Sequence, residues 1–416
     1  MRQSFYSQNA WWLGNGLGLT FASSFGQTFF IALFAGFIRE TYGLSDGAWG
    51  GLYTLATFAS AACLIQFGRL ADTMPLVRLA SVIILIYAAA ALTMALSNSI
   101  VALAVAVFGL RFCGQGMMTH IAMTAMARWF RANRARAIAV AAMGFPLGEA
   151  VLPFLTVEAI ALVGWRTAWV MVAAFLLVAV LPTMFVLMRH GRTPGGEGGD
   201  ETALGMGGRH WTRGEVLRHW SFWILLPGLM APPFIGTCAF FHQVHIAEVR
   251  NYDLAMMALG FPLYAAVSVA SSLGAGLVLD KVGVIKVLPA VLVPMALAIP
   301  ILALPGGIWV WYLLLVGTGI SQGVVVTLVG ALWPTLYGTR WIGSIKAVAT
   351  AAMVVATAVG PGVTGLLIDW GYPFPEQALW LSAYCFVMTI LFAAVAPRLA
   401  RMQTPLAGQV RTEGAD

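Results

Sequence analysis

Long runs of hydrophobic residues, separated by short polar segments, repeat along the chain. Each run has about 20 residues or more, which is the length that an α-helix needs to cross a hydrocarbon core about 30 Å thick. The runs are continuous, whereas strands of a membrane β-barrel alternate in character over about 10 residues. We count twelve runs, at residues 11–37, 48–71, 77–97, 100–127, 137–162, 167–189, 219–247, 255–279, 285–304, 308–336, 343–368 and 377–397. The pattern predicts an all-α membrane protein with twelve transmembrane helices.

Composition and charge agree with this prediction and add an orientation. Of the 416 residues, 60% are hydrophobic and only 9% are charged. When the 23 Lys and Arg residues are sorted by segment, 19 fall on the side of the amino terminus, three fall on the other side, and Arg111 lies inside a helix. Because cytoplasmic loops retain positive charge, we expect a multi-pass protein of the inner membrane with both termini in the cytoplasm. The net charge of +7 then reflects sidedness in the lipid bilayer and predicts no nucleic-acid partner.

The chain repeats itself around its least apolar stretch. We expect an amino-terminal six-helix half at 1–189, a cytoplasmic linker at 190–218, a second six-helix half at 219–400 and a cytoplasmic tail at 401–416. At an offset near 208, Asp72 matches Asp280 and Pro153 matches Pro361. Two pseudo-symmetric halves are the architecture in which a site between them is exposed to each side in turn. The duplication therefore predicts a transporter.

The loop after the second run carries the sequence Gly68-Arg-Leu-Ala-Asp72-Thr-Met-Pro-Leu-Val-Arg78. It is similar to the hallmark motif of the major facilitator superfamily, and the resemblance spans essentially the whole chain. Within that superfamily, "ARWFRANRARAIAVAAMGFPLG" resembles the bacterial branch of monocarboxylate porters and oxalate:formate exchangers. The resemblance implies the major facilitator fold and a cytoplasmic gate. The expected gate residues are Gly68, Asp72, Arg78, Gly276, Asp280 and Lys286.

The gate also has a physical basis that does not depend on the resemblance. An aspartate at the cytoplasmic end of one helix is stabilised by the positive amino-terminal end of a helix in the other half. We expect Asp72 to meet the start of the eleventh helix near Gly343, and Asp280 to meet the start of the fifth near Arg134 and Arg136.

Two ionisable residues lie deep inside the predicted spans, Arg111 in the fourth and Glu149 in the fifth. A charge at the bilayer centre costs at least about 2.5–3.5 kcal/mol, so such residues face a partner or a cavity. At 1.5 Å per residue, the two lie at similar depths. Arg111 therefore either binds a substrate carboxylate or holds Glu149 ionised until that residue takes up a proton. A third possibility is a fixed Arg111–Glu149 ion pair that only joins two helices.

"Arg111-Phe-Cys-Gly114-Gln-Gly116" is similar to the arginine motif of the superfamily's fourth helix, which is linked to proton coupling, although the usual Gln and Gly lie one residue nearer to the arginine. Other polar residues expected at the substrate site are Asn15, Gln27, His242 and Gln322. We read His120 as structural, because it is rotated about 180° from Arg111 around the same helix. The cysteines and histidines lack metal-ligand spacing, and no Walker loop or nucleophile motif occurs. We expect no metal, no cofactor and no enzymatic activity.

These features predict a secondary transporter that moves a small organic anion, a carboxylate in our interpretation, coupled to protons or to exchange. We expect it to function as a monomer. The nearest alternative is a proton-driven exporter of multiple drugs or other amphiphiles. A second alternative is a transporter-like sensor that binds its ligand without moving it.

Overall fold

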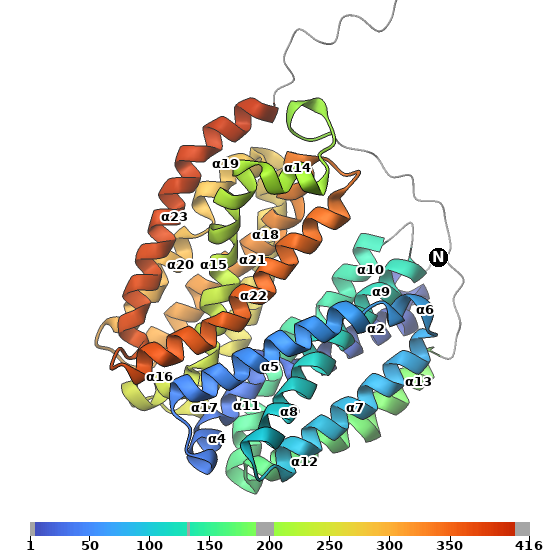
Figure 1. The fold of residues 1–416 in the computed structure, drawn as a ribbon, viewed down its shortest axis with the longest axis vertical. Helices are drawn as coiled ribbons and strands as arrows, with labels where there is room; N and C mark the ends of the chain where they lie inside the picture. Colours follow the sequence, from blue (N-terminus) through green and yellow to red (C-terminus); the bar gives the residue numbers. More distant parts are fainter. Residues whose placement is uncertain (1–4, 131–133, 189–203, 404–416) are drawn as a thin grey trace, which may run out of the picture. The chain divides into compact units, whose positions relative to one another are not determined.

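The computed structural model describes residues 5–130, 134–188 and 204–403, and all regular elements in these ranges are helices (Figure 1). Eleven helices are long and apolar enough to cross a membrane, and a bent pair of helices near the amino terminus would make a twelfth. This confirms the predicted all-α architecture.

The helices of the first six spans follow the predicted runs closely. They are α2 (Ala10–Ala22), α3 (Thr28–Ile31) and α4 (Ala35–Tyr42) in the first span, then α5 (Asp46–Phe67), α7 (Leu76–Leu96), α8 (Ile100–Leu110) with α9 (Thr119–Trp129), α10 (Arg134–Ala142) with α11 (Gly144–Val163), and α12 (Trp165–Phe175) with α13 (Leu181–Met188).

The remaining spans follow in the same order. They are α15 (Trp220–Phe241) with α16 (Gln243–Arg250), α17 (Leu254–Ala258) with α18 (Phe261–Val282), α19 (Val284–Val287) with α20 (Val293–Ala298), α21 (Trp309–Tyr337), α22 (Ile342–Asp369) and α23 (Phe374–Gln403). The short helices α1 (Phe5–Gln8), α6 (Leu70–Thr73) and α14 (Arg213–Arg218) lie outside the spans.

The chain packs as two compact units that do not coincide with the two predicted halves. Unit 1 contains the described residues of Met1–Gly199 together with Thr237–Ala265 and Ala358–Phe374. Unit 2 contains the described residues of Asp200–Gly236, Ala266–Thr357 and Pro375–Asp416. Within unit 1, α7 and α12 run side by side, and within unit 2, α20 packs against α21 (Figure 1). Unit 1 therefore combines the first six spans with one end of the seventh, eighth and eleventh.

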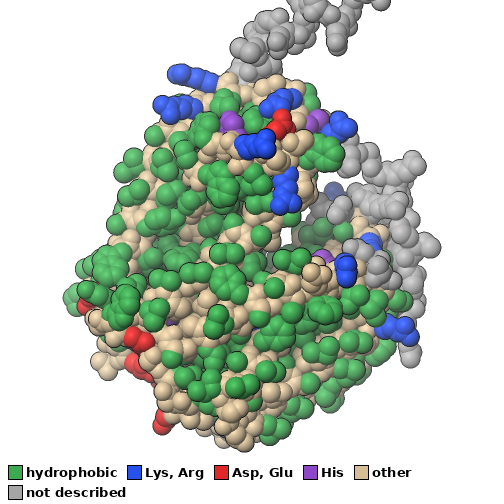
Figure 2. Space-filling view, in the orientation of Figure 1, with side chains coloured by type: hydrophobic (Ala, Val, Ile, Leu, Met, Phe, Trp, Pro, Cys, Tyr) green, Lys and Arg blue, Asp and Glu red, His purple; other side chains and the backbone are tan. Residues whose placement is uncertain are grey.

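Hydrophobic side chains cover most of the visible surface, as expected for helices that face lipid (Figure 2). In unit 2, Lys and Arg side chains gather at the end that carries α14 and α19 (Figure 2). The described residues of the predicted linker are hydrogen-bonded in this unit: the backbone N–H of Trp211 donates to the Tyr337 carbonyl at the end of α21, at 3.0 Å. The described part of the linker is therefore attached to unit 2.

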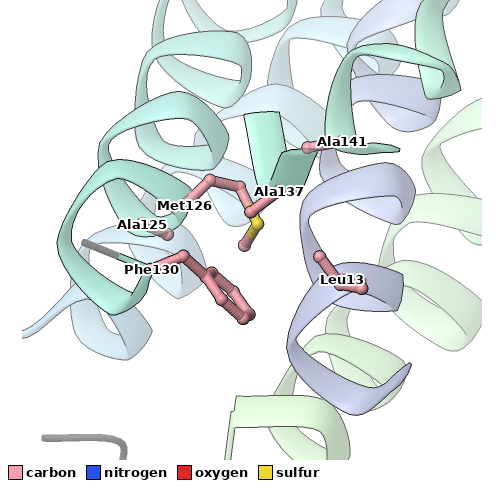
Figure 3. Packing of buried hydrophobic residues seen from close by; sticks show 6 residues of the cluster. All are labelled: Leu13, Ala125, Met126, Phe130, Ala137 and Ala141. Carbon is pink, nitrogen blue, oxygen red and sulfur yellow. The ribbon is translucent and has the colours of Figure 1, made fainter. Parts of the chain in front are cut away.

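The first, fourth and fifth spans pack together in unit 1 through a cluster of hydrophobic side chains. Leu13 on α2 belongs to one buried cluster with Met126 on α9 and Ala141 on α10, and the cluster also holds Ala125, Phe130 and Ala137 (Figure 3). A Cβ atom on Gly16 would lie only 2.8 Å from the Ala141 Cβ, so these helices approach closely because position 16 has no side chain. This packing fixes α2 against the fourth and fifth spans, which carry Arg111 and Glu149.

Candidate functional site

The first span is broken in its middle, at Gln27. The backbone of Gln27 is extended, with φ −85° and ψ 157°, and the helical parts on its two sides meet at an angle of 43°. The break leaves carbonyl groups at the end of the first part without their usual helical donors, which is tolerated in a membrane only where other groups satisfy them. The sequence did not predict this break, although "SSFGQTFF" is unusually polar for a transmembrane run.

Arg111 supplies a donor at this break. Its side chain is only 1% exposed, and its Nη1 atom donates to the Gly26 carbonyl at 3.0 Å and to the Thr28 hydroxyl at 3.4 Å. The guanidinium also lies over the ring of Tyr53, 5.1 Å from its centroid. Arg111 begins a π-helical segment, Arg111–Met118, and such segments are frequent at functional sites. The cation is thus held by a backbone carbonyl and an aromatic face.

Close backbone contact between the first and fourth spans makes this arrangement possible. A Cβ atom on Gly26 would lie 2.1 Å from the Leu110 carbonyl oxygen, and one on Gly114 would lie 2.7 Å from the Gly26 Cα. The Tyr53 and Thr28 hydroxyls bond to each other at 2.8 Å beside the guanidinium. Tyr53 and Thr28 were not among the predicted site residues, because a tyrosine or threonine in an apolar run gives no distinctive signal.

Two of the three guanidinium nitrogens of Arg111, Nε and Nη2, have no hydrogen-bond partner among the described residues. Buried polar groups in proteins are almost always hydrogen-bonded, so two orphaned donors on one cation are unusual. Nε and Nη2 lie on one edge of the guanidinium plane, the edge on which a carboxylate accepts two parallel hydrogen bonds. The arrangement retains the capacity to bind an anion.

Glu149 does not pair with Arg111: in the ranges that the structure describes, no ion pair or hydrogen bond joins the two side chains. The possibility of a fixed Arg111–Glu149 ion pair is therefore not realised in this structure. Glu149 is 6% exposed on α11 and has the phenol of Tyr264 within electrostatic range. It is a nearly buried carboxyl, and no ion pair to a described Lys or Arg side chain is formed.

Aromatic rings from four spans form a connected cluster that includes Tyr264, the phenol in electrostatic range of Glu149. Phe145, one turn before it, packs edge-on against Phe29 with ring centroids 6.1 Å apart. Phe29 in turn contacts Phe261 at 6.2 Å, and Phe240 contacts both Phe261 at 5.2 Å and Tyr264 at 5.1 Å. We call these five rings the aromatic cluster.

The other predicted site residues are distributed over several places. Asn15 is 2% exposed, has no partner for its amide within the described chain, and lines a small groove against α13. Gln27 forms the break of the first span, beside the carbonyl that Arg111 binds. Gln322, in unit 2, is half-buried. Gln243, which follows His242, donates from its Nε2 to the Phe29 carbonyl at 3.0 Å and connects the seventh span to the first.

The predicted cytoplasmic gate stays a prediction. The Asp72 side chain lies outside the described part of the structure. Gly68 is buried, and its carbonyl is 3.0 Å from the Nε2 atom of His120, which gives His120 the structural role expected for it. Arg78, Asp280 and Lys286 are exposed, and Gly276 is half-buried.

A cluster of charged residues that the sequence did not predict lies at the other end of unit 1. We call Arg39, Asp46, His242, His245 and Glu248 the charged cluster. Arg39 donates to Asp46 Oδ2 at 2.7 Å and to both Glu248 oxygens at 2.9 and 3.0 Å. The Nδ1 atoms of His242 and His245 lie 3.8 and 3.7 Å from the two oxygens of Asp46. His242, expected at the substrate site, belongs to this cluster.

Further contacts hold the same region together. Asp369, at the end of α22, accepts from the Ser45 hydroxyl at 2.7 Å and from the Gly47 backbone N–H at 3.0 Å. The described residues contain no group of three or more His, Cys, Asp or Glu side chains arranged to hold a metal ion. The charged cluster therefore joins the first and second spans to the seventh, and hydrogen bonds of Asp369 and Thr364 add the eleventh span.

Comparison with solved structures shows which known proteins share this fold. A bacterial homolog of the human lysosomal transporter Spinster, in an inward-facing and unoccupied conformation, matches with a TM-score of 0.69 at 16% identity over 96% of this chain and 98% of that chain. The nucleoside transporter NupG matches with a TM-score of 0.70 at 12% identity, covering 92% of this chain and 98% of that chain. At these identities the likeness shows the fold alone.

Comparison with sequences gives a family. No curated protein sequence matches the chain. The family model described as Major Facilitator Superfamily matches residues 16–361, which is most of the chain and includes both the broken first span and Arg111. The chain belongs to the major facilitator superfamily.

Proposed function

We propose that this protein is a secondary active transporter that moves a small organic anion bearing a carboxylate across the inner membrane, by alternating access with proton coupling or exchange. Membership of the superfamily supports transport of a small molecule. The anionic substrate and the coupling rest on the residues of unit 1. The protein acts as a monomer, with both termini in the cytoplasm.

The observation that supports an anionic substrate is the edge of the Arg111 guanidinium that has no hydrogen-bond partner in the described chain. Its Nε and Nη2 have no partner in the described chain although the side chain is almost completely buried. An unpaired buried donor costs about 1–3 kcal/mol, and more when it is charged, so a ligand that satisfies both donors gains that free energy. Because Arg111 is closed off in this conformation, the anion reaches it when the break at Gln27 rearranges. The absence of an ion pair to Glu149 leaves that edge available.

Glu149 carries the coupling proton in this proposal. A carboxyl that is 6% exposed and lacks a cationic partner among the described residues is most stable in its neutral form. It becomes charged when water reaches it, and a site that alternates between these states takes up a proton on one side and releases it on the other. Asp72 and Asp280 close the cytoplasmic side.

The test is uptake of monocarboxylates and dicarboxylates by proteoliposomes, with and without a pH gradient. We expect Arg111→Gln to abolish carboxylate uptake, while Arg69→Gln, which changes an exposed arginine, leaves it unchanged. Carboxylate uptake that survives in Arg111→Gln would refute the anion site. We expect Glu149→Gln to keep counterflow and to lose pH-driven uptake; if both remain intact, Glu149 carries no proton.

The aromatic cluster beside Glu149 favours a second candidate function, the export of cationic amphiphiles. A carboxyl next to several aromatic rings suits a ligand that combines a positive charge with an apolar body. In the same proteoliposomes, this candidate requires proton-driven transport of cationic dyes that Glu149→Gln abolishes and Arg111→Gln retains.

A further inference from the structure

The charged cluster has more negative than positive charge when its histidines are neutral. Arg39 is the cation, whereas Asp46 and Glu248 in the cluster and Asp369 beside it are anions, which gives a net charge of −2. Asp46 is 13% exposed at its side chain, so solvent screens its charge only partly. The cluster is therefore a place where an added proton would lower the electrostatic energy.

The hydrogen bonds of His242 determine which of its ring nitrogens is free. Its Nε2 lies 2.8 Å from the Thr364 hydroxyl, and that hydroxyl donates its single proton to the Gly360 carbonyl at 2.7 Å. With the hydroxyl proton donated to Gly360, Nε2 is the donor to Thr364 and the neutral ring carries its lone pair on Nδ1, and we adopt this tautomer for His242. This lone pair faces Asp46 Oδ1 at 3.8 Å, so a proton on Nδ1 would be attracted by the Asp46 carboxylate.

His245 has the opposite arrangement. Its Nε2 accepts from the Phe374 backbone N–H at 3.5 Å, so the neutral ring carries its proton on Nδ1, which points toward Asp46 Oδ2 at 3.7 Å. The neutral form of His245 already suits its neighbours, and a second proton would displace the Phe374 donor. The two histidines therefore respond differently to acid.

We propose that His242 Nδ1 is a proton-binding site, and that a proton bound there, between the imidazole and Asp46, stabilises the closed state of the charged cluster. Alternating access requires the first and second spans to separate from the seventh and eleventh at this end, so the inference rests on the proposed transport function for its purpose. Separation takes His242 away from Asp46 and removes the electrostatic attraction that holds the proton on His242.

The direction of the pH effect follows from linkage. An isolated imidazole changes its charge near pH 6.5. In this proposal the bridging proton is held only in the closed cluster, so closure is favoured at low pH and is lost as the pH rises. One linked proton changes the ratio of closed to open molecules by at most about tenfold per pH unit, in the range above about pH 6.5.

The test measures this ratio without any substrate. Spin labels are attached to cysteines introduced as Thr41→Cys on α4 and Val249→Cys on α16, two exposed positions, in a protein that also carries Cys63→Ser. Pulsed and continuous-wave EPR then report the distance between the labels in lipid from pH 5 to pH 8.5. We expect the short-distance population to fall by up to about tenfold per unit as the pH rises above about 6.5.

The variants identify the group that titrates. We expect His242→Gln to abolish the pH dependence, and His245→Gln and His120→Gln to retain it, the latter because His120 bonds to Gly68 at the other end of the unit. A His242→Gln protein that titrates like the wild type, or a closed population that grows as the pH rises, would overturn the proposal.

A spectroscopic measurement keeps the inference testable if His242→Gln folds poorly. The 15N signals of the wild-type histidines at pH 8.5 should include a neutral ring protonated on Nε2 that disappears in Thr364→Val; finding every neutral ring protonated on Nδ1 refutes the assignment. If the EPR titration is present but carboxylate uptake is absent, the proposed substrate is wrong and the proton site stands. If carboxylate uptake depends on Arg111 but the EPR titration is absent, the proton site is wrong and the proposed substrate stands.

Discussion

Replacing Gly114 by alanine should separate the first and fourth spans at the point where Arg111 binds the broken helix. A Cβ atom there would lie 2.3 Å from the Tyr87 hydroxyl oxygen and 2.7 Å from the Gly26 Cα. The Tyr87 oxygen is fixed to its buried ring, whose Cζ would also lie 2.7 Å away, and the Gly26 Cα is backbone and moves only with its helix. Gly116, two residues further, is a matched control because its Cβ would meet Leu64 side-chain atoms at 3.5 Å and the Arg111 carbonyl oxygen at 3.7 Å, which are ordinary contacts.

The size of the effect follows from the geometry. Ordinary contact begins at 3.4 Å, so the first span must retreat by about 0.7 Å from its 2.7 Å approach. The same movement lengthens the 3.0 Å bond from Arg111 Nη1 to the Gly26 carbonyl to about 3.7 Å, which is no longer a hydrogen bond. Overpacking costs about 1–3 kcal/mol and a lost bond to a charged group a similar amount. Because both costs arise from one displacement, we expect roughly 3 kcal/mol rather than their sum.

Two assays follow the displacement. The first is the thermal midpoint in detergent at a fixed scan rate, which we expect to fall by roughly 5 °C in Gly114→Ala and by less than 1 °C in Gly116→Ala. The second is the labelling rate of Cys113, a thiol with no exposed surface, in a Cys63→Ser background. Faster labelling in Gly114→Ala indicates that the contact has opened. Equal midpoints and equal labelling in both variants would refute the close-contact explanation.

Three further outcomes are expected. Arg166→Gln removes two hydrogen bonds of 2.7 and 2.8 Å to carbonyls at the end of α7, so it should cost about 1.5–3 kcal/mol in thermal unfolding and leave the KM of uptake unchanged. Gly47→Ala should reduce uptake several-fold, because its Cβ would lie 2.3 Å from a carboxylate oxygen, whereas Gly51→Ala, with open space around it, should transport normally. The backbone N–H of Thr212 holds the pKa of Glu215 at about 2, below its usual 4.5. The start of α14 should therefore keep its protection from amide exchange above about pH 4.5 and lose it toward pH 2. The Glu215→Gln variant should not show this loss.

The twelve spans were predictable because lipid contact requires continuous apolar runs, and those runs have only one stable structure in a membrane. That Arg111 would need a polar partner was predictable for the same reason, since a cation is rare in such a run. The identity of that partner was not. Depth along the two helices placed Arg111 and Glu149 at similar levels, but depth does not fix the rotation of either helix. In the structure, the Arg111 side chain donates to the Gly26 carbonyl of the first span.

The break at Gln27 and the charged cluster were missed for two different reasons. A helix break inside an apolar run has no strong signature unless it contains proline, and this one contains glycine followed by glutamine. The charged cluster brings together Arg39 and Asp46 with His242, His245 and Glu248, about 200 residues further along the chain. Sorted by loop, these residues look like ordinary charges at helix ends. Only the fold shows that Arg39, His242 and His245 share the carboxylate of Asp46.

The contact between the first and fourth spans and the charged cluster are held together by different forces. That difference indicates which of the two responds to a proton. The contact between the first and fourth spans at Gly26 and Gly114 is made of backbone atoms, whose packing does not change with pH. The charged cluster is made of side chains that face a common anion, and a single proton on His242 changes its energy. A transporter that uses protons must let them act on contacts that open and close. We therefore expect pH to control the opening of the charged cluster first, and to reach Glu149 only through the access that this opening provides.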